Sequence, residues 1–156
     1  MEIERKFLLN ERFQQEILTK RLQSHQLTQY YVQVGEDEER YRQQDNLYFH
    51  TIKKRMDSGL QREEIETECT KGDFEVNKCN MVGNIIEKKR YVFPFGEHKV
   101  EIDVYGGILK GLIICEVEFQ SKDDAESFVP PDFFGTEVTW NKGYKNQSLA
   151  IKGLPI

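Results

Sequence analysis

The sequence predicts an α+β fold whose centre is an eight-stranded, antiparallel, closed β-barrel with a few short helices outside it. Strand-like segments recur along the chain and are joined mostly by short hairpin turns. Within these segments, charged residues of both signs alternate with apolar residues, so each strand has one charged and one apolar face. Such a sheet either exposes its charges or curls so that they line a water-filled lumen, and about eight strands suffice for closure. We expect the second arrangement.

Length and composition fit one domain over residues 1–156. The net charge of −5 comes from 27 acidic and 22 basic residues, which gives no basic footprint for nucleic acid. We expect no membrane partner, because the sequence has no apolar leader and no run of about 18 apolar residues. The 3 cysteines form no CxxC pair and are interpreted as reduced thiols of a cytoplasmic protein.

The first strand is expected at residues 2–7. Glu2, Glu4 and Lys6 share one of its faces, and the residues between them share the other. Asn10 is a suitable cap for a following helix, whose apolar side chains would cover the outside of the sheet.

Further strands in the first half are expected at residues 27–34, 40–42, 47–53 and 60–69, which are rich in branched and aromatic residues or alternate in charge. Asp45 and Asn46 predict the hairpin turn between the second and third of these strands. An acidic turn is expected at residues 35–39, and another turn at 54–59.

The second half begins with an ambiguous stretch at residues 70–81, where a short helix is favoured although Gly72 and Val76 weaken it. The next strands are expected at residues 84–95, 99–105 and 112–120. A helix should then begin near Ser121 and end at Pro130.

The C-terminal segment is expected to hold a loop around Trp140 and a short helix that Asn146 caps.

The charged face carries a set of acidic and a set of basic side chains, and each set is expected to bind a different ligand. Carboxylates of Glu2, Glu4, Glu116 and Glu118, with those of Glu101 and Asp103 between them, would cluster in a barrel and repel one another. A hard divalent cation, Mg²⁺ or Mn²⁺, would neutralise them.

The basic side chains on that face are Lys6, Arg40, Arg42, Lys53, Arg62, Lys88 and Arg90. They are too many to match the carboxylates one by one if a metal takes the acids, so an anion with several charges is expected. A linear triphosphate satisfies both demands, because its oxygens can ligate a metal and accept forked hydrogen bonds from arginine.

The start Glu2-x-Glu4-x-Lys6 resembles the signature of the CYTH superfamily, the triphosphate tunnel metalloenzymes. The resemblance continues through the whole chain, in family order, with Arg40-Tyr41-Arg42, Thr51-Ile52-Lys53, Arg62-x-Glu64-x-Glu66, Lys88-x-Arg90-Tyr91, Glu101-x-Asp103-Val104-Tyr105, Glu116-Val117-Glu118 and Glu137-Val138-Thr139.

This resemblance implies a triphosphate tunnel closed by a C-terminal plug helix. It implies Mg²⁺ or Mn²⁺ held by Glu2, Glu4, Asp103, Glu116 and Glu118. It further implies that Lys88 and Tyr31 shape the catalytic site, where we also place Glu64 and Glu66 as ligands of a second metal or as groups that orient water. A homodimer is an alternative to a monomer.

One departure from the family pattern occurs before the C-terminal helix. Small members often carry Asp-x-Arg-Tyr-x-Asn there, whereas this chain has Asn141 and Gly143 in place of the acid and the arginine. The change is expected to leave this end of the tunnel less basic and more mobile, with Lys142 or Lys145 as compensating bases.

The sequence thus predicts a metal-dependent hydrolase of a linear triphosphate, most simply inorganic tripolyphosphate, that releases orthophosphate. Two alternatives remain open: a class IV-type adenylyl cyclase that makes cyclic AMP from ATP, and a tunnel that binds polyphosphate or a nucleotide without turnover. The products formed from ATP distinguish the hydrolase from the cyclase.

Overall fold

The computed structural model describes residues 3–19, 22–55 and 62–155. Glu2 and most of the expected turn at 54–59 lie outside these residues, as does the side chain of Arg62. The strands are β1 (Ile3–Leu9), β2 (Gln23–Gln33), β3 (Glu38–Gln44), β4 (Leu47–Arg55), β5 (Arg62–Cys69), β6 (Val82–Phe95), β7 (His98–Tyr105), β8 (Ile113–Phe119) and β9 (Phe134–Glu137). The α-helices are α1 (Gln14–Thr19), α2 (Lys71–Val76), α3 (Lys122–Ser127) and α4 (Asn146–Lys152).

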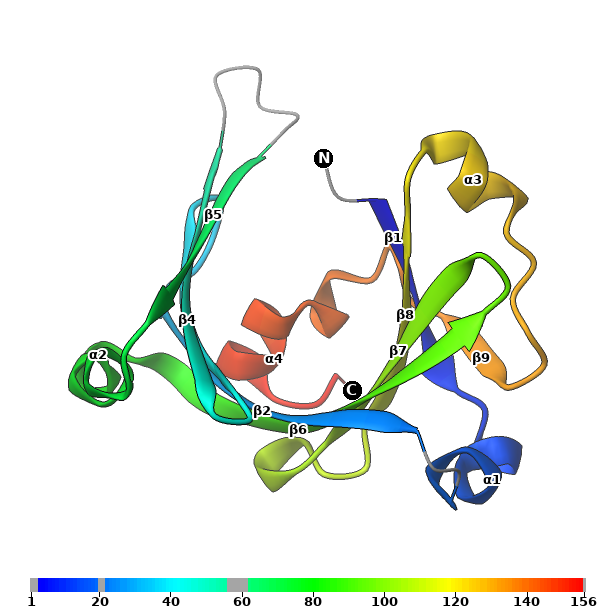
Figure 1. The fold of residues 1–156 in the computed structure, drawn as a ribbon, viewed down its shortest axis with the longest axis horizontal. Helices are drawn as coiled ribbons and strands as arrows, with labels where there is room; N and C mark the ends of the chain where they lie inside the picture. Colours follow the sequence, from blue (N-terminus) through cyan, green and yellow to red (C-terminus); the bar gives the residue numbers. More distant parts are fainter. Residues whose placement is uncertain (1–2, 20–21, 56–61, 156) are drawn as a thin grey trace.

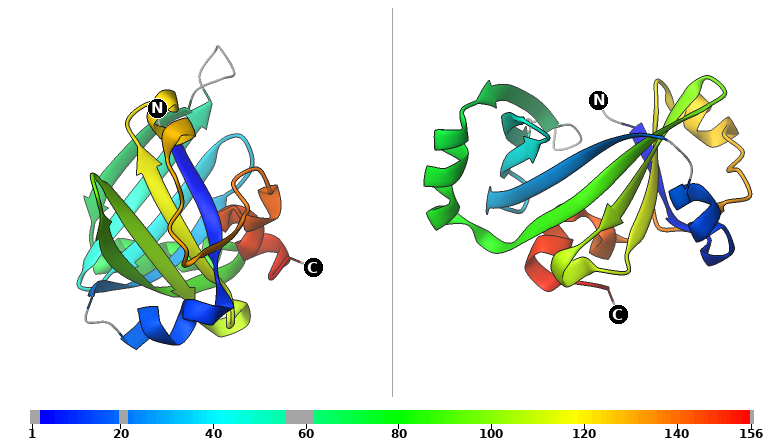
Figure 2. Two further views of the ribbon diagram at one scale, coloured as in Figure 1. Left: turned by 90° about the vertical axis from the view of Figure 1, so that its right-hand side faces the viewer. Right: turned by 60° about the horizontal axis from the view of Figure 1, so that its bottom comes forward.

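The strands form one antiparallel sheet in the order β5-β4-β3-β2-β6-β7-β8-β1-β9. This sheet curls into a deep trough, with α1, α2 and α3 outside the curve and α4 within it (Figure 1). Figure 2 shows the same trough from its side and from below. The prediction of an α+β fold with an antiparallel sheet and few helices is confirmed.

The prediction of a closed, eight-stranded barrel is wrong, because the described strands number nine and no hydrogen bonds among them join β5 to the other end of the sheet. The second edge of β1 is occupied by β9, with Phe7 opposite Glu137. The backbone N–H of Val138 also donates to the carbonyl of Lys6 at 2.8 Å. In this part of the sheet β9, and not β5, is therefore the second neighbour of β1. The short strand β9 itself was not predicted.

Apolar residues cover both ends of the outer face of the sheet. Phe7, Ile102 and Val117 of β1, β7 and β8 pack with Phe128, which follows α3. On the other arm of the trough, Tyr30, Tyr41 and Phe74 form a second cluster under α2. A third cluster lies on the inner face, where Leu149 and Ala150 of α4 pack against Tyr31, Ile86, Tyr105 and Ile114. Burial of these faces fixes the strand register, and therefore the direction of the charged side chains.

Most local predictions are confirmed. The ambiguous stretch at 70–81 holds α2 and a 3₁₀ turn, Asn77–Asn80, and Thr70 forms a capping box with Asp73. Ser121 caps α3 through its side chain. The prediction that Asn146 caps the last helix is wrong: Lys145 is the N-cap, without a side-chain hydrogen bond, and Asn146 is the first helical residue. The Asn146 side chain instead accepts a 2.8 Å hydrogen bond from the Tyr105 hydroxyl.

Candidate active site

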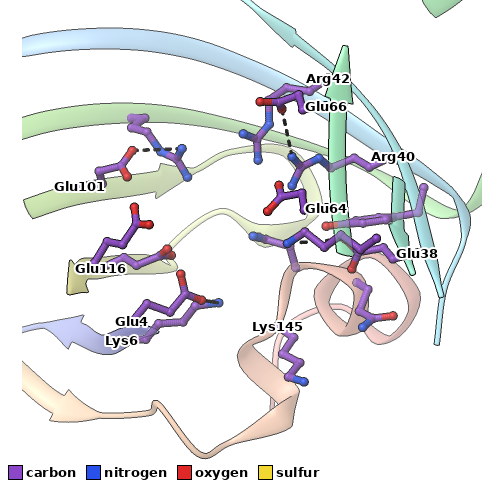
Figure 3. A pocket seen from close by; sticks show the side chains of 16 residues that line it. Glu4, Lys6, Glu38, Arg40, Arg42, Glu64, Glu66, Glu101, Glu116 and Lys145 are labelled. Carbon is purple, nitrogen blue, oxygen red and sulfur yellow. Dashed lines mark ion pairs between the residues drawn. The ribbon is translucent and has the colours of Figure 1, made fainter. Parts of the chain in front are cut away.

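The inner face of the trough holds a cavity of about 700 Å³. Charged side chains from seven of the described strands and from Lys145, the N-cap of α4, point into it (Figure 3). Its described lining consists of Glu4, Lys6, Tyr31, Glu38, Arg40, Arg42, Lys53, Glu64, Glu66, Arg90, Glu101, Glu116, Glu118, Lys145, Asn146 and Gln147. The charged stripes seen in the sequence therefore face a shared hollow, as predicted.

Carboxylates gather at one end of this cavity because of the register between β1 and β8, which sets Glu4 opposite Glu118 and Lys6 opposite Glu116. Burial would raise the pKa of Glu116, but a hydrogen bond with Glu4 and the charge of Lys6 outweigh it and lower that pKa. Two carboxylates that face each other in this way need a proton or a cation between them.

The chemistry of these acids fits a hard cation. Among the residues that the structure describes, however, no three His, Cys, Asp or Glu side chains are close enough to form a metal site as they stand. Glu4, Glu116 and Glu118 converge from adjacent strands, whereas Glu101 is paired with Arg90 at 3.1 Å. The acids thus provide suitable oxygen ligands that would have to close around an ion.

Three arginines form the floor of the cavity. Burial and the positive charges of Arg40 and Arg90 lower the pKa of Arg42 to about 9. The Nε of Arg42 donates to Gln29 Oε1 at 2.8 Å, which fixes the guanidinium in place without neutralising it. The Nε of Arg40 is buried and has no hydrogen-bond partner in the described structure. An anion in the cavity would relieve the repulsion among the guanidinium groups.

Lys88, Arg90 and Asp103 form a buried ionic group beside this floor. Lys88 Nζ lies 2.8 Å from Asp103 Oδ2, and the side chains are 0% and 4% exposed. Arg90 donates to both Asp103 oxygens, at 2.8 and 3.0 Å. Burial would raise the pKa of Asp103, but the two cations hold it well below its usual range.

On the opposite arm, acids and bases alternate across β3, β4 and β5. Lys53 lies opposite Glu38 on β3 and opposite Glu64 on β5, and its Nζ is 4.0 Å from Glu38 Oε2. Glu66 Oε1 accepts a 3.0 Å hydrogen bond from Thr51 and lies 3.7 Å from Arg40 Nη2. This arm therefore carries both the bases and the second pair of acids that the sequence predicted.

Tyr31 lies in the floor between the arms, opposite Arg40 on β3. Burial raises the pKa of its hydroxyl to about 12, so the phenol stays protonated at neutral pH. Its hydroxyl can accept a 3.5 Å hydrogen bond from the Gln29 amide.

The start of α4 lies at one end of the cavity and is tied to the sheet. The backbone N–H of Gly35 donates to Gln147 Oε1 at 2.8 Å, and the Asn84 amide donates to the Ala150 carbonyl at 3.3 Å. Gly83 passes so close that a Cβ there would lie 2.6 Å from that carbonyl. The Gly143 N–H donates to the Asn141 side chain, which caps a 3₁₀ turn at Lys142–Tyr144.

Of the predicted site residues, the cavity brings together Glu4, Lys6, Tyr31, Arg40, Arg42, Lys53, Glu64, Glu66, Arg90, Glu116 and Glu118. Lys88 and Asp103 stand apart from this lining set. Arg62 is the first residue of β5, opposite Arg55.

Sequence reasoning missed Glu38, because residues 35–39 were assigned to a turn. Glu38 alternates with Arg40 and Arg42, and this spacing could have placed it on the inner face. Of the two lysines suggested as compensating bases, Lys145 lines the cavity.

Among the described residues, no helix is long and apolar enough to cross a membrane. No protein-family model matches the chain. The chain is 40% identical over 151 residues to an inorganic triphosphatase of Nitrosomonas europaea. The aligned region covers 96% of this chain and 97% of that protein.

Several solved structures share the fold, and two of them differ in their identity to this chain. One is the crystal structure of an inorganic triphosphatase, with a TM-score of 0.71 and 35% identity, covering 100% of this chain and 97% of the other. The second is a protein from Hippeastrum named as an adenylyl cyclase and described as having a dominant triphosphatase activity, with a TM-score of 0.62, 16% identity and coverage of 81% and 83%. The second likeness concerns the fold alone. On the identity and coverage of the Nitrosomonas relative, the chain belongs to the inorganic triphosphatase family, in keeping with the CYTH superfamily that its motifs resemble.

Proposed function

We propose that this protein hydrolyses inorganic tripolyphosphate to orthophosphate and pyrophosphate, and that the reaction depends on Mg²⁺ or Mn²⁺. The observation that carries the proposal is the arginine floor. Arg42 is buried between two other guanidinium groups, and the neighbouring Arg40 has a buried N–H without an acceptor. Like charges packed in this way cost stability unless a multivalent anion binds them. The family relationship identifies the class of anion.

The basic side chains bind and orient the chain of phosphates. Arg40, Arg42 and Arg90 would donate to its oxygens from the floor, while Lys6 of β1 and Lys53 of β4 would reach it from opposite arms of the trough. Asp103 acts indirectly, because it fixes Arg90 through two hydrogen bonds and is itself held by Lys88. Lys88 thus acts on the phosphate site through Asp103 and Arg90, and Tyr31 lines the cavity directly.

Glu4, Glu116 and Glu118, joined by Glu2, would hold the metal. When bound, Mg²⁺ or Mn²⁺ neutralises charge on the phosphate oxygens and makes the phosphorus more electrophilic. The role first assigned to Asp103 as a ligand competes with its ion pairs to Lys88 and Arg90, so we place it with the phosphate-binding groups.

Hydrolysis needs no nucleophilic side chain. A water molecule that Glu64 or Glu66 orients would attack a terminal phosphorus, forming one P–O bond while the anhydride P–O bond breaks. The proton of the water passes to a carboxylate or to solvent, and pyrophosphate leaves with its charge balanced by the arginines.

The decisive experiment incubates the purified protein with tripolyphosphate and Mg²⁺ or Mn²⁺, with EDTA as the control, and follows orthophosphate release. Metal-dependent release supports the proposal. A chain that binds tripolyphosphate tightly by calorimetry but releases no phosphate is a binding tunnel instead. With ATP as substrate, cyclic AMP and pyrophosphate would identify a cyclase, whereas orthophosphate identifies a hydrolase.

A further inference from the structure

We propose that Glu38 limits the length of the phosphate chain that the cavity accepts, and so makes the site selective for three phosphates. This inference rests on the proposed function and assigns a specificity-determining residue within it.

Glu38 places a negative charge in a cavity that we propose binds a polyanion, where a basic side chain would be expected. It is the first residue of β3, two positions before Arg40, and therefore faces the cavity with the arginines. Its side chain is 8% exposed, and its carboxylate lies 4.0 Å from Lys53 Nζ. Its negative charge also contributes to raising the pKa of Tyr31. Glu38 is thus a buried charge within the site.

The position of Glu38 is the end of the cavity next to α4. The turn before β3 is tied to α4 by the hydrogen bond from Gly35 to Gln147. In Figure 3, Glu38 stands beside the helix, while Glu4, Glu101 and Glu116 stand at the far end. Arg40 and Arg42 lie between them, together with Glu64 and Glu66, whereas Lys6 lies beside Glu4. The phosphate site is therefore bounded by the metal-binding acids at one end and by Glu38 at the other.

The electrostatic consequence differs between substrates. A chain that fits between the two ends gains the arginines and stops short of Glu38, while Glu64 and Glu66 line the cavity beside the arginines. A longer chain would place a further phosphate against Glu38, whose charge is weakly screened because the side chain is buried. Lys53 Nζ, 4.0 Å from the Glu38 carboxylate, offsets part of this repulsion, and the remainder acts against the additional phosphate.

The test compares tripolyphosphate with tetrapolyphosphate for the wild type and for Glu38→Gln, which keeps shape and removes charge. We expect the ratio of kcat/KM for tetrapolyphosphate over tripolyphosphate to rise about tenfold, as removal of one buried repulsion predicts. Calorimetry of both anions in EDTA, where no turnover occurs, should show the same shift in relative affinity.

The matched control is Glu39→Gln, one residue away. Glu39 faces the outside of the trough and pairs with His50 at 2.8 Å, so this variant should keep the wild-type ratio. Glu38→Asp, which keeps the charge, should also keep it. Thermal unfolding of each variant shows whether the fold is intact, and Glu38→Ala serves as the second neutral variant if Glu38→Gln does not fold.

Three outcomes overturn the inference. If the wild type cleaves tripolyphosphate and Glu38→Gln has the same selectivity for three phosphates as the wild type, Glu38 does not limit the chain length, and the proposed function still holds. A Glu38→Gln protein with reduced turnover and an unchanged ratio identifies Glu38 as a group that acts on water or a cation. A wild type that neither binds nor cleaves tripolyphosphate overturns the proposed function as well.

Discussion

Lys88 and Asp103 form a 2.8 Å ion pair between neighbouring strands, and both side chains are buried. Asp103 also receives two hydrogen bonds from Arg90, so its carboxylate is saturated by cations of the floor. The carboxylate therefore fixes the guanidinium of Arg90, the arginine that we propose binds phosphate.

Asp103→Asn should lower the free energy of unfolding by about 3 kcal/mol, because it leaves the buried Lys88 ammonium without a counter-ion. Urea unfolding measures this change. The control is Asp124→Asn, whose partner His98 lies in a more exposed pair, and which should cost under about 1 kcal/mol. A stable Asp103→Asn protein that has lost metal affinity would return Asp103 to the metal site.

The lowered pKa of Lys88 predicts how the free energy of unfolding changes with pH. Burial lowers the pKa of Lys88 to about 7, even though Asp103 acts to raise it, whereas the ordinary value is 10.5. Between these values the folded state binds fewer protons than the unfolded state, so the unfolding free energy should rise with pH from about 7 to 10. Lys88→Met should flatten this rise, and Lys89→Met on the opposite face of the same strand should keep it. Equal slopes in urea unfolding at pH 7, 8 and 9 for wild type and Lys88→Met would contradict the prediction.

Arg42 should contribute to binding at the expense of stability. Arg42→Met removes a buried charge that two neighbouring arginines repel, so we expect the unliganded protein to be as stable as wild type or more stable. Its affinity for tripolyphosphate should fall at least about tenfold, since a forked donor is lost. Unfolding with and without tripolyphosphate measures both effects in one experiment. Arg55→Met, which removes an exposed ion pair with Glu36, is the control. A marked loss of stability in unliganded Arg42→Met would show that the arginine is satisfied without an anion.

Gly83 holds α4 against β6. Gly83 has a φ of +74°, and an added Cβ would lie 2.6 Å from the Ala150 carbonyl, so Gly83→Ala should displace the helix that lines the cavity. We expect a loss of about 2 kcal/mol or more and lower activity. Gly96→Ala is the matched control, because Gly96 has a similar φ of +60° but nothing within 4 Å of its Cβ position, and should cost about 1 kcal/mol. If the two variants lose the same free energy of unfolding, the close approach of Gly83 to α4 does not contribute to stability.

Glu116 should be required for metal binding. Calorimetric titration of Mn²⁺ into the protein without phosphate should show an affinity at least about tenfold weaker for Glu116→Gln, because one oxygen ligand of negative charge is lost. Glu126→Gln changes an exposed acid of α3 in the same way and should bind as wild type does. If the two variants bind Mn²⁺ equally, Glu116 does not belong to the metal site.

Eight of the strands, their charged faces and the chemical nature of the site follow from the amino-acid sequence alone. Alternation at two-residue spacing is a local property, so Glu4, Arg40, Arg42 and Glu116 could be assigned to one face before any packing was known. The family motifs then related that face to triphosphate.

Closure of the sheet and the pairing of charges could not be predicted, because both depend on contacts between segments that are distant in the sequence. β9 follows two prolines and is only 4 residues long, so its pairing with β1 was not visible in the sequence, and it is β9 rather than β5 that lies beside β1. The register between strands also sets which acid pairs with which base. Asp103 pairs with Lys88 and Arg90, and Glu38 pairs with Lys53. Charge alternation tells which face a side chain occupies, but only the strand order and register place its partner, because hydrogen bonding between strands fixes both.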